Sequence, residues 1–528
     1  MSRRFQWFMG CLTMLCALGS DPLGDRSPAD PGAKQPRFAP VGSRDYHVSP
    51  GGDDSHSGTA AKPWKTIAKV NTTDLRPGDR VLFEGGKTFQ GTISLDTRDS
   101  GVSDRKVRVS SYGSGRATIN GGDGSGLIAK GCSHLVVEDL NFVGCGRKQG
   151  NNGSGVTVRD GTGIEVDRAE VSGFRLDGLA AISVRDTRIT HVHAHDNGSS
   201  GIGVGGGDSA GELSENVYIG RCVAENNAGD PLNLDNHSGN GIVVGGVKGC
   251  LIEYCEAMNN GWDMPHEGNG PVGIWAWNAD RVTIQFCVAH DNKSPSADGG
   301  GFDLDGGVTN SVLQYNYSYH NEGPGYFLCQ YPTGPVWKNN IVRYNVSVND
   351  GTKNNTQSAL EVYGGDERMS DAEVYNNTVY NERGGAVGFG ALPAPKVRFR
   401  NNIFITGGQM IKGDPAPARF EGNCYWTIGG GRFAVGEHAS LAEWAAATGQ
   451  ERTEGAIVGL FADPLLTDLG SAPPLKPEQL ESLAAYRLRP GSPCLGAGLL
   501  IQNNGGRDFW GRKVPKDKRP SIGAGEKP

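Results

Sequence analysis

A short unit recurs along the chain from residue 150 onward, and it restricts the fold more than any other feature. Each unit is a small residue followed by an apolar residue, any residue and a second apolar residue, as in Gly155-Val-Thr-Val158. Successive units start 23 to 40 residues apart, and the shortest interval, 23, occurs twice in succession. A period near 23 residues suits one coil of three short strands and three turns. The units begin at Gly155, Gly178, Gly201, Gly241, Gly273, Gly301, Gly325, Ala359 and Ala386.

A second column of residues keeps the same register. An aromatic residue followed by Cys or Asn recurs once per coil, and equivalent residues of parallel coils stack about 4.8 Å apart. The pairs are Tyr254-Cys255, Phe286-Cys287, Tyr315-Asn316, Tyr344-Asn345 and Tyr375-Asn376, with Cys222 one coil earlier. Aromatic rings would then stack, Asn amides would form ladders, and Cys222, Cys255 and Cys287 would stay unpaired as small apolar groups. We therefore predict an all-β chain folded as a right-handed, single-stranded parallel β-helix, a solenoid with N- and C-terminal caps.

The remaining segments suggest how the chain is divided. Arg3 and Arg4 precede an apolar stretch at 5–18, which predicts a signal peptide at 1–19 and export to the periplasm, the cell surface or the medium. Residues 20–43 read as a disordered lead-in, 44–100 as the N-terminal cap and first coils, 101–410 as the β-helix, and 411–528 as a C-terminal capping region. Caps are expected because an open coil end exposes unpaired strand edges. Residues 62–70 would supply a short capping helix.

Both ends of this chain carry further signals. Residues 46–54, 58–59, 62–67 and 77–83 resemble the opening of exported β-helix carbohydrate-active proteins of the pectin-lyase-like superfamily. Residues 463–464, 486–493, 508–511 and 521–526 resemble the closing segment of the same superfamily. The resemblance implies a β-helix over about 44–526 and a carbohydrate ligand. The chemistry stays open, because this superfamily includes lyases, hydrolases, epimerases and binding proteins.

Composition excludes several other classes of protein. Of the 528 residues 82 are Gly, without a three-residue period, so the chain is not collagen-like. A net charge of −7 and the lack of a basic run argue against nucleic acid as a partner. No segment after the signal peptide has the length and apolarity of a membrane span. We expect a monomer with a polysaccharide as its partner.

One outward face carries the candidate site. Within each unit the apolar residues point inward, so the residue between them and the residue after them point outward. In the middle coils these outward pairs are aromatic or acidic, whereas neighbouring coils show mainly Gly. Indole rings suit sugar rings, because the apolar sugar face stacks on them. The outward pairs are Gly203/Gly205, Val243/Gly245, Trp275/Trp277, Asp303/Asp305, Phe327/Cys329, Glu361/Tyr363 and Gly388/Gly390.

Several coils are longer than the basic period, and the excess falls just before the next unit, at 225–240, 258–272, 290–300 and 349–358. We expect these loops to rise along one edge of the outward face and form a cleft wall, since loops on a rigid scaffold often carry function. They bring in Asp230, Asp235, His237, Asp263, His266, Glu267, His290 and Asp298.

We favour a secreted polysaccharide-degrading enzyme, specifically a glycoside hydrolase without a cofactor. Asp303 and Glu361 occupy equivalent positions two coils apart, about 9–10 Å between backbones, and leaning side chains would reach the inverting range of about 6.5–9.5 Å. Asp305 is a second candidate for base or nucleophile. The expected substrate contacts are Trp275, Trp277, Phe327, Tyr363, His266 and His237.

Two other functions remain open. A Ca²⁺-dependent lyase for uronate-containing polysaccharide would use Asp298, Asp303 and Asp305 as oxygen ligands, but the outward face offers no Lys or Arg as its base. Such a base would come from the loops, as His266, Lys293 or Lys353. The third alternative is a non-catalytic carbohydrate-binding or surface structural β-helix. His191, His193 and His195 alternate as on a zinc-binding strand, yet we interpret them as coil and turn residues and assign no metal site.

Overall fold

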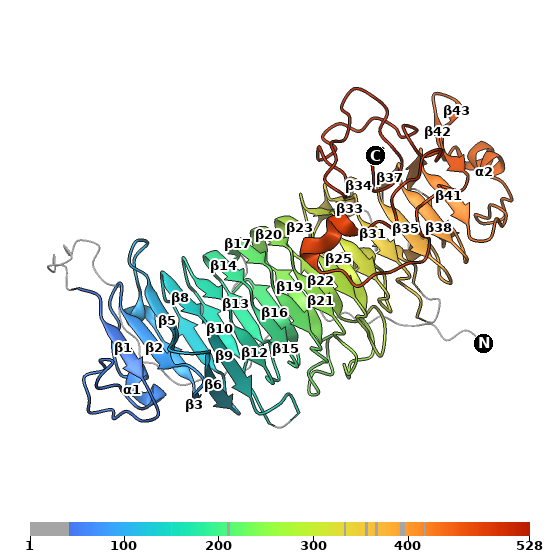
Figure 1. Cartoon of the computed structure of the whole chain (residues 1–528). Coiled ribbons are helices and arrows are strands. Elements are labelled where there is room, and N and C mark those ends of the chain that lie inside the picture. Colours follow the sequence, from blue (N-terminus) through green and yellow to red (C-terminus); the bar gives the residue numbers. More distant parts are fainter. Residues whose placement is uncertain are drawn as a thin grey trace.

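The computed structural model describes residues 42–148, 150–207, 212–331, 334–353, 357–364, 368–390, 396–416 and 418–527. The predicted signal peptide and almost all of the predicted lead-in lie outside the described residues. Three long parallel sheets run along an elongated stack of coils, and a typical coil contributes one strand to each sheet (Figure 1). The predicted parallel β-helix is confirmed.

The three sheets are named here by their first strands. The β1 sheet contains β1 (Asp45–Val48), β2 (Arg80–Glu84), β5 (Val107–Tyr112), β8 (Leu135–Glu138), β11 (Glu165–Asp167), β14 (Arg185–Thr190), β17 (Ser214–Gly220), β20 (Val247–Glu253), β23 (Asp280–Gln285), β26 (Val312–Gln314), β30 (Ile341–Arg343), β34 (Ala372–Tyr375), β37 (Val397–Arg400) and β40 (Arg419–Glu421). The β3 sheet contains β3 (Thr88–Gln90), β6 (Ala117–Gly122), β9 (Leu140–Gly144), β12 (Glu170–Ser172), β15 (His193–His195), β18 (Val223–Glu225), β21 (Glu256–Met258), β24 (Val288–His290), β27 (Tyr317–Tyr319), β31 (Val346–Val348), β35 (Thr378–Asn381), β38 (Ile403–Thr406), β41 (Cys424–Thr427) and β44 (Leu460–Phe461). The β4 sheet contains β4 (Ile93–Leu95), β7 (Leu127–Lys130), β10 (Val156–Arg159), β13 (Leu179–Ile182), β16 (Ser200–Gly205), β19 (Asn240–Gly245), β22 (Val272–Trp277), β25 (Gly300–Leu304), β28 (Tyr326–Gln330), β32 (Leu360–Gly364), β36 (Val387–Gly390) and β39 (Ile411–Lys412). Two small pairs complete the strands, β29 (Trp337–Lys338) with β33 (Met369–Ser370) and β42 (Arg452–Thr453) with β43 (Ala456–Ile457). The coils thus continue on both sides of the interval 101–410.

The recurring units form the β4 sheet, in the register that the sequence predicts. The outward column pairs Val243 with Trp275, Trp275 with Asp303, Asp303 with Phe327, Phe327 with Glu361, and Glu361 with Gly388. The alternate residues of these strands are apolar and fill the narrow core. The register follows from burial, because a slip of one residue would expose every core side chain.

The cysteine column is confirmed, and the aromatic column is confirmed from Tyr254 to Tyr344, whereas Tyr375 lies in register with Arg343. Cys222, Cys255 and Cys287 are fully buried and unpaired, and the Cys255 backbone N–H donates to Cys287 Sγ at 3.4 Å. Beside them, the rings of Tyr254 and Phe286 stack with centroids 5.2 Å apart. The column therefore stabilises the stack of coils by packing, without covalent links.

An asparagine ladder continues the cysteine column, but it departs from the predicted register at one position. Asn316 Nδ2 donates to Asn345 Oδ1 at 3.1 Å, and Asn345 Nδ2 donates to Asn377 Oδ1 at 3.0 Å. The predicted member Asn376 is wrong, because Tyr375 lies in register with Arg343 and the turn places Asn376 opposite Tyr344 and Asn377 opposite Asn345. Asn376 adopts φ 52° and instead donates to the carbonyls of Ser521 and Gly523.

Each ladder ends at a buried carboxyl group. The first ladder ends where Asn423 Nδ2 donates to Glu451 Oε1 at 2.7 Å. A second ladder, which the sequence analysis missed, ends where Asn321 Nδ2 donates to Asp350 Oδ1 at 2.8 Å. The remaining members of the second ladder are Asn197, Asn227, Asn260 and Asn292.

Short helices lie at the two ends of the coil stack. At the N-terminal end, α1 (Ile67–Asn71) starts after Thr66, whose hydroxyl accepts from the Lys69 N–H, and it buries Ile67 and Val70. This agrees with the capping helix expected near 62–70. At the other end, α2 (Leu441–Thr448) packs Trp444 against Phe420 with ring centroids 5.6 Å apart. The 3₁₀ helices are η1 (Thr97–Asp99) and η2 (Pro477–Ser482).

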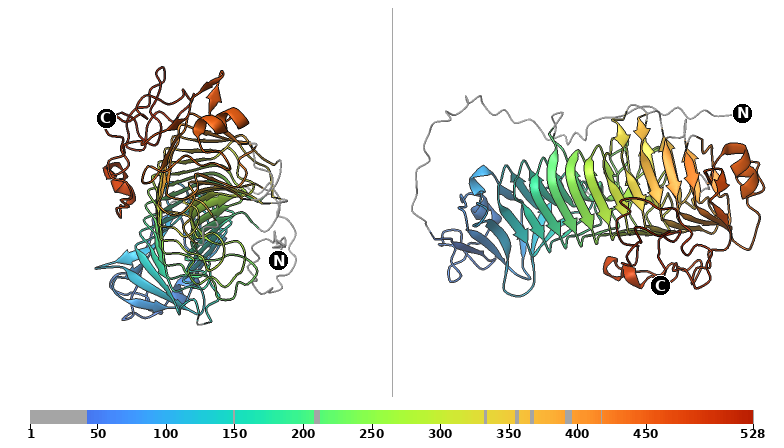
Figure 2. Two further views of the ribbon diagram at one scale, coloured as in Figure 1. Left: turned by 90° about the vertical axis from the view of Figure 1, so that its right-hand side faces the viewer. Right: turned by 90° about the horizontal axis from the view of Figure 1, so that it is seen from above.

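The C-terminal segment does not extend the coils but turns back along their outer surface (Figure 2). Lys476 Nζ lies 2.7 Å from Glu256 Oε2, and Arg221 lies 2.5 Å from Glu478, so this segment reaches coils more than 200 residues away in sequence. None of the helices in the described part of the chain has the length and apolarity needed to cross a membrane.

Candidate active site

Hydrogen bonds connect the loops that precede β22, β25 and β32, which the sequence analysis expects to form a wall beside the β4 sheet. Asp298, in the loop between β24 and β25, connects its neighbours on both sides. Its Oδ2 accepts from the Gly270 N–H at 2.8 Å, and its Oδ1 accepts from Gln357 Nε2 at 2.8 Å. Lys353 Nζ also donates to the Ser296 carbonyl at 3.2 Å. Hydrogen bonds between coils thus fix the wall.

Other loop residues stabilise the wall rather than face a ligand. Asp230 pairs with Arg175 at 3.0 Å, and Asp263 pairs with Arg147 and Lys148. Three of the expected loop residues lie elsewhere: Asp235 and Glu267 are exposed, and His290 lies on the outer face of the β3 sheet.

The wall closes over the outward column, which the sequence analysis treats as an open face. The side chains between Trp275 and Glu361 are nearly inaccessible, with exposed fractions of 5% for Trp275, 3% for Asp303, 6% for Phe327 and 5% for Glu361. The neighbouring outward column remains partly exposed. It contains Trp277, Asp305, Cys329 and Tyr363, so a ligand would reach the carboxyl groups from this side.

His237, one of the two predicted binding histidines, lies beside Trp275, and His266 lies near His237. Trp275 Nε1 donates to Asn240 Oδ1 at 3.1 Å, and its ring lies 5.2 Å from the ring of His237. Burial, together with the nearby His266, lowers the pKa of His237 to about 4. His237 is therefore neutral at neutral pH, and this end of the site presents aromatic and amide groups.

Asp303 is the least satisfied polar group of the site. Its Oδ1 atom is buried and has no hydrogen-bond partner among the described residues. Burial raises the pKa of Asp303 well above its usual range, and the nearby carboxyls of Asp305 and Asp298 raise it further. Trp275 and Phe327 flank Asp303 in the adjacent coils. Burial thus favours the protonated form of this carboxyl group.

Asp305 lies two residues further along the same segment, in a different environment. Burial raises its pKa to about 6, against hydrogen bonds from the Gly306 N–H and the Cys329 thiol that lower it. The Gly306 N–H donates to Asp305 Oδ1 at 2.6 Å. Asp305 is therefore mainly ionised at neutral pH, whereas burial favours the protonated form of Asp303.

Glu361 does not lean toward Asp303, contrary to the convergence expected from the sequence. Its Oε2 accepts from the Ser358 N–H at 2.9 Å and lies 1.9 Å from the point where a Cβ at Gly388 would stand. The carboxyl group therefore points toward the next coil, away from Asp303. Burial raises the pKa of Glu361 to about 7, and the nearby Lys412 opposes this.

Lys412 extends the outward column by one coil, paired with Gly388. The expectation that this face offers no Lys or Arg is therefore wrong. The reason is that the coil of Ile411 and Lys412 lacks the recurring unit, so no pattern placed Lys412 in the column. The glycines at 388 and 390 were the available signal in the sequence. Two glycines in an outward column leave room for side chains that reach over from the neighbouring coils.

The lyase alternative places a calcium ion among the acidic residues. Across the described residues, no group of three or more His, Cys, Asp or Glu side chains is arranged to hold a metal ion. Asp298, one of the three expected ligands, already uses both oxygens to accept hydrogen bonds from the wall. Asp298 is therefore already part of the hydrogen-bond network that links the loops.

The fold and the buried carboxyl groups define a right-handed parallel β-helix protein with a walled site on one sheet. The chain belongs to the family described as Pel9A-like, right-handed β-helix region, whose model matches residues 46–361.

Individual relatives are distant. The chain is 24% identical over 479 residues to a lacto-N-biosidase of Bifidobacterium longum subsp. longum, across 70% of this chain and 29% of that protein. The chain thus spans under a third of the length of that curated relative. Among solved structures, a GH136 lacto-N-biosidase from Eubacterium ramulus has a TM-score of 0.50 at 19% identity, over 70% of this chain and 68% of that one. Pectate lyase Pel9A has a TM-score of 0.40 at 16% identity, over 92% and 97%.

Proposed function

We propose that this protein is a glycoside hydrolase that cleaves an oligosaccharide or polysaccharide at the row of carboxyl groups on the β4 sheet. The observation that carries the proposal is the contrast between Asp303 and Asp305. Two carboxyl groups two residues apart have pKa values pushed to different levels, and such a separation assigns acid and base roles.

In this mechanism Asp303 is the general acid. Its proton passes to the glycosidic oxygen as the bond to the anomeric carbon breaks, so the leaving sugar departs as an alcohol. The ionised Asp305 then acts in one of two ways. It either removes a proton from an attacking water or attacks the anomeric carbon itself to form a glycosyl-enzyme that water hydrolyses. The anomeric form of the first product distinguishes the two.

The surrounding residues bind the sugar and exclude water. Trp277 and Tyr363 are partly exposed beside the carboxyl groups, so their rings can stack on sugar faces. The walled side limits access of bulk water, which strengthens electrostatic interactions at the reacting bond. Glu361, with its pKa near 7 and Lys412 nearby, acts in this proposal on substrate position rather than as the acid.

The lacto-N-biosidase relatives support hydrolysis as the reaction class, and the proposal needs no cofactor. The predicted signal peptide would place the enzyme outside the cytoplasm, where such carbohydrates are met.

The test is a panel that includes an aryl lacto-N-bioside, neutral polysaccharides and uronate-containing polysaccharides. We expect new reducing ends without ultraviolet absorbance from unsaturated product, and activity that is indifferent to chelator. Asp303→Asn and Asp305→Asn should each lower kcat by about 10²–10⁴-fold. Unsaturated product that disappears with chelator would establish the calcium-dependent lyase instead. Binding without any turnover would leave the non-catalytic alternative.

A further inference from the structure

The outer face of the β3 sheet carries the same arrangement of one histidine and two carboxylates twice. In each copy the histidine Nδ1 lies 2.7 Å from the Asp that follows it, and its Nε2 lies 3.4 Å from a Glu of the preceding coil. The first copy consists of Glu170, His195 and Asp196, and the second of Glu256, His290 and Asp291.

The chemistry of these contacts is incomplete without a positive charge. A carboxylate only accepts hydrogen bonds, so the Nδ1 atom that faces Asp196 must carry the hydrogen. The Nε2 atom of a neutral ring is then an acceptor as well. It faces Glu170 Oε1, another acceptor, at 3.4 Å. A proton or a cation between Nε2 and Oε1 would turn the repulsion between these two acceptor atoms into attraction.

The second copy obtains its positive charge from the protein. Lys476 of the C-terminal segment lies 2.7 Å from Glu256 Oε2. Burial opposes the charged form of His290, yet hydrogen bonds to Asp291 and Glu256 outweigh it and raise the pKa of His290. The Tyr319 ring stacks on His290 with centroids 4.5 Å apart, which closes this copy.

The first copy has different neighbours in the equivalent places. The register pairs Glu170 with His193, where Glu256 pairs with Val288. The first copy thus gains a second imidazole in the place of an apolar side chain.

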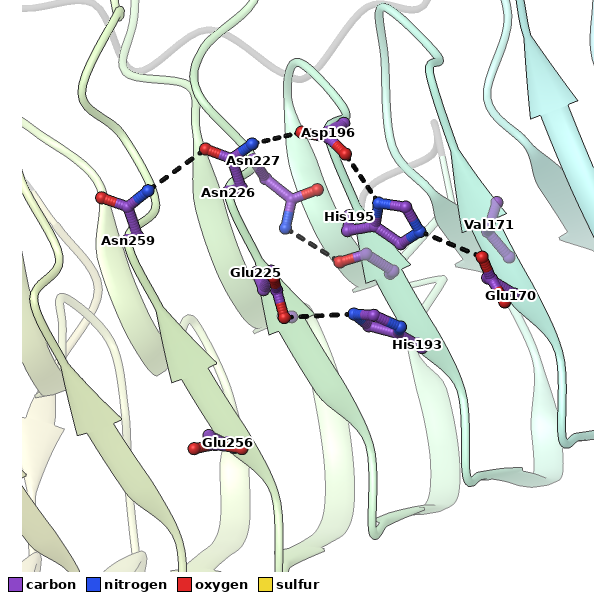
Figure 3. Close-up of polar contacts among 12 residues, drawn as sticks. Glu170, Val171, His193, His195, Asp196, Glu225, Asn226, Asn227, Glu256 and Asn259 are labelled. Carbon is purple, nitrogen blue, oxygen red and sulfur yellow. Dashed lines mark hydrogen bonds and ion pairs between the residues drawn. The ribbon is translucent and has the colours of Figure 1, made fainter. Parts of the chain in front are cut away.

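On the other side of its histidine, the first copy gains a carboxylate in the place of a phenol. The register pairs His195 with Glu225, whereas His290 pairs with Tyr319. His193 Nε2 lies 3.3 Å from Glu225 Oε2, and the rings of His193 and His195 are 4.5 Å apart (Figure 3).

The first copy also remains open to solvent. Its side chains are 21% exposed for His195, 42% for His193, 37% for Glu225 and 44% for Glu170. Arg116 approaches Glu170 Oε2 only at 3.9 Å, beyond hydrogen-bond distance. The first copy therefore lacks a close counterpart of Lys476 among the described residues.

We propose that His193, His195, Glu225 and Glu170 bind a divalent transition-metal ion of the Zn²⁺ type. Two imidazoles and two carboxylates form the N and O donor set that Zn²⁺ takes in four-coordinate sites. Asp196 supplies the orienting carboxylate that metal-bound histidines usually have on their other nitrogen. Asn226 in turn donates to Asp196 and holds it in place.

No three of these side chains already surround a common point, in keeping with the lack of preformed clusters in the described part of the chain. They project from adjacent strands β12, β15 and β18 on one face, so rotation about side-chain bonds brings them together without backbone movement. The site lies on a different sheet from the carboxyl row and is independent of the proposed function. A bound ion would link three coils and stabilise the folded chain.

The test is calorimetric titration of the full chain with Zn²⁺ after dialysis against chelator, together with the Tm with and without Zn²⁺. We expect one ion per chain and a higher Tm. His195→Ala, and His193→Val, which copies the second arrangement, should abolish both effects. His290→Ala removes the equivalent imidazole of the second copy and should leave both unchanged.

Asp196→Ala provides a milder variant in case the histidine changes disturb folding, and it should weaken binding about 10–100-fold. Circular dichroism of each variant checks the fold. The proposal is overturned if Zn²⁺ neither binds stoichiometrically nor moves Tm, which would leave a proton as the only cation there. It is equally overturned if the stoichiometry survives in the double variant of His193 and His195, or if His290→Ala is the change that abolishes binding.

Discussion

Glu361 lies directly over Gly388, whose missing side chain leaves the space that the carboxyl group occupies. Glu361 Oε2 would stand 1.9 Å from a Cβ at position 388, well inside contact distance. The direction of Glu361, away from Asp303, thus depends on a glycine in the next coil.

Gly388→Ala should therefore expel the Glu361 carboxyl group from its place. We expect a loss of about 1–3 kcal/mol in the free energy of unfolding, as for other overpacked sites, measured by urea denaturation. Gly205→Ala, at an outward position of β16, is the matched control, because a Cβ there would meet no atom within 4 Å. Equal effects of the two changes would contradict the observed direction of Glu361.

Trp275 and Trp277 should differ in role, although both belong to the outward columns. Trp275 is 5% exposed and bonded to Asn240, so Trp275→Ala should cost about 3–5 kcal/mol of stability. Trp277 is partly exposed, so Trp277→Ala should raise KM or weaken sugar binding with a small change in Tm. Isothermal titration with the best substrate and thermal melts measure the two effects. A large stability loss for Trp277→Ala would place its ring in the core.

Asp303 and Asp305 should act as a unit if the proposed mechanism holds. The Asp303→Asn, Asp305→Asn double variant should be little slower than the slower single variant, because catalytic groups that work together are strongly non-additive. Glu361→Gln should lower turnover less than either single change. Multiplicative losses in the double variant, or a loss of the same size in Glu361→Gln, would return Glu361 to the catalytic pair.

Cys329 should tune Asp305 through its thiol. The thiol hydrogen bond lowers the pKa of Asp305, so Cys329→Ala should raise that pKa above about 6. Since the mechanism needs ionised Asp305, the acidic limb of the kcat/KM profile should move to higher pH. Cys329→Ser retains a donor and should keep the wild-type limb. Cys145→Ala removes another partly exposed thiol, and a shift there as well would show that the effect is not specific.

The carboxyl group of Glu451 should make stability depend on pH. Burial raises its pKa from 4.5 to about 7 in the folded chain, against hydrogen bonds from Asn423 and Tyr425 that lower it. Below the unfolded-state value of about 4.3 its contribution is fully present. It is lost as pH rises through about 7, by up to about 3 kcal/mol at 1.36 kcal/mol per pH unit.

Glu451→Gln removes this titration, so its unfolding free energy should fall less between acid and mildly alkaline pH than that of the wild type. It should also be less stable at acid pH, because the amide nitrogen would face a donor. The Gly422 N–H donates to Oε2 and Tyr425 Oη donates to Oε1, at 2.6 and 2.8 Å. Urea unfolding at several pH values measures both effects. Parallel pH profiles of variant and wild type would contradict the assignment.

The register of the coils could be predicted from the sequence, because a residue shifted by one position would change from core to surface. Trp275, Asp303, Phe327 and Glu361 therefore stack as expected. Their burial could not be predicted, since it depends on how the loops fold over them, and loops have no period. The Asn376 error has a different cause, because Tyr375 is a strand residue in register with Arg343 and so does not mark the turn position that the earlier aromatic residues occupy.

The direction of side chains within a column was also beyond the sequence. The Glu361 carboxyl group points toward the next coil because Gly388 leaves space for it there. Lys412 lies in a coil that lacks the recurring unit, so no pattern placed it in the column. The two histidine arrangements likewise share no continuous motif, since each combines residues from adjacent coils. Only the known register makes their equivalence visible.

The two asparagine ladders give the stack of coils a direction. The Nδ2 group of each ladder asparagine donates to the asparagine Oδ1 of the next coil along the chain. The last asparagine of a ladder therefore needs an acceptor in the coil that follows it. Asp350 and Glu451 supply this acceptor and end the ladders, because a carboxylate accepts without donating. A carboxylate nevertheless ends a ladder without ending the stack, because the strands β34 to β39 follow Asp350 in the same sheets. Each ladder also begins at an asparagine whose Oδ1 accepts from a backbone N–H of the preceding coil, as Asn197 does from Phe174. A ladder can therefore start and stop at different coils of one continuous stack.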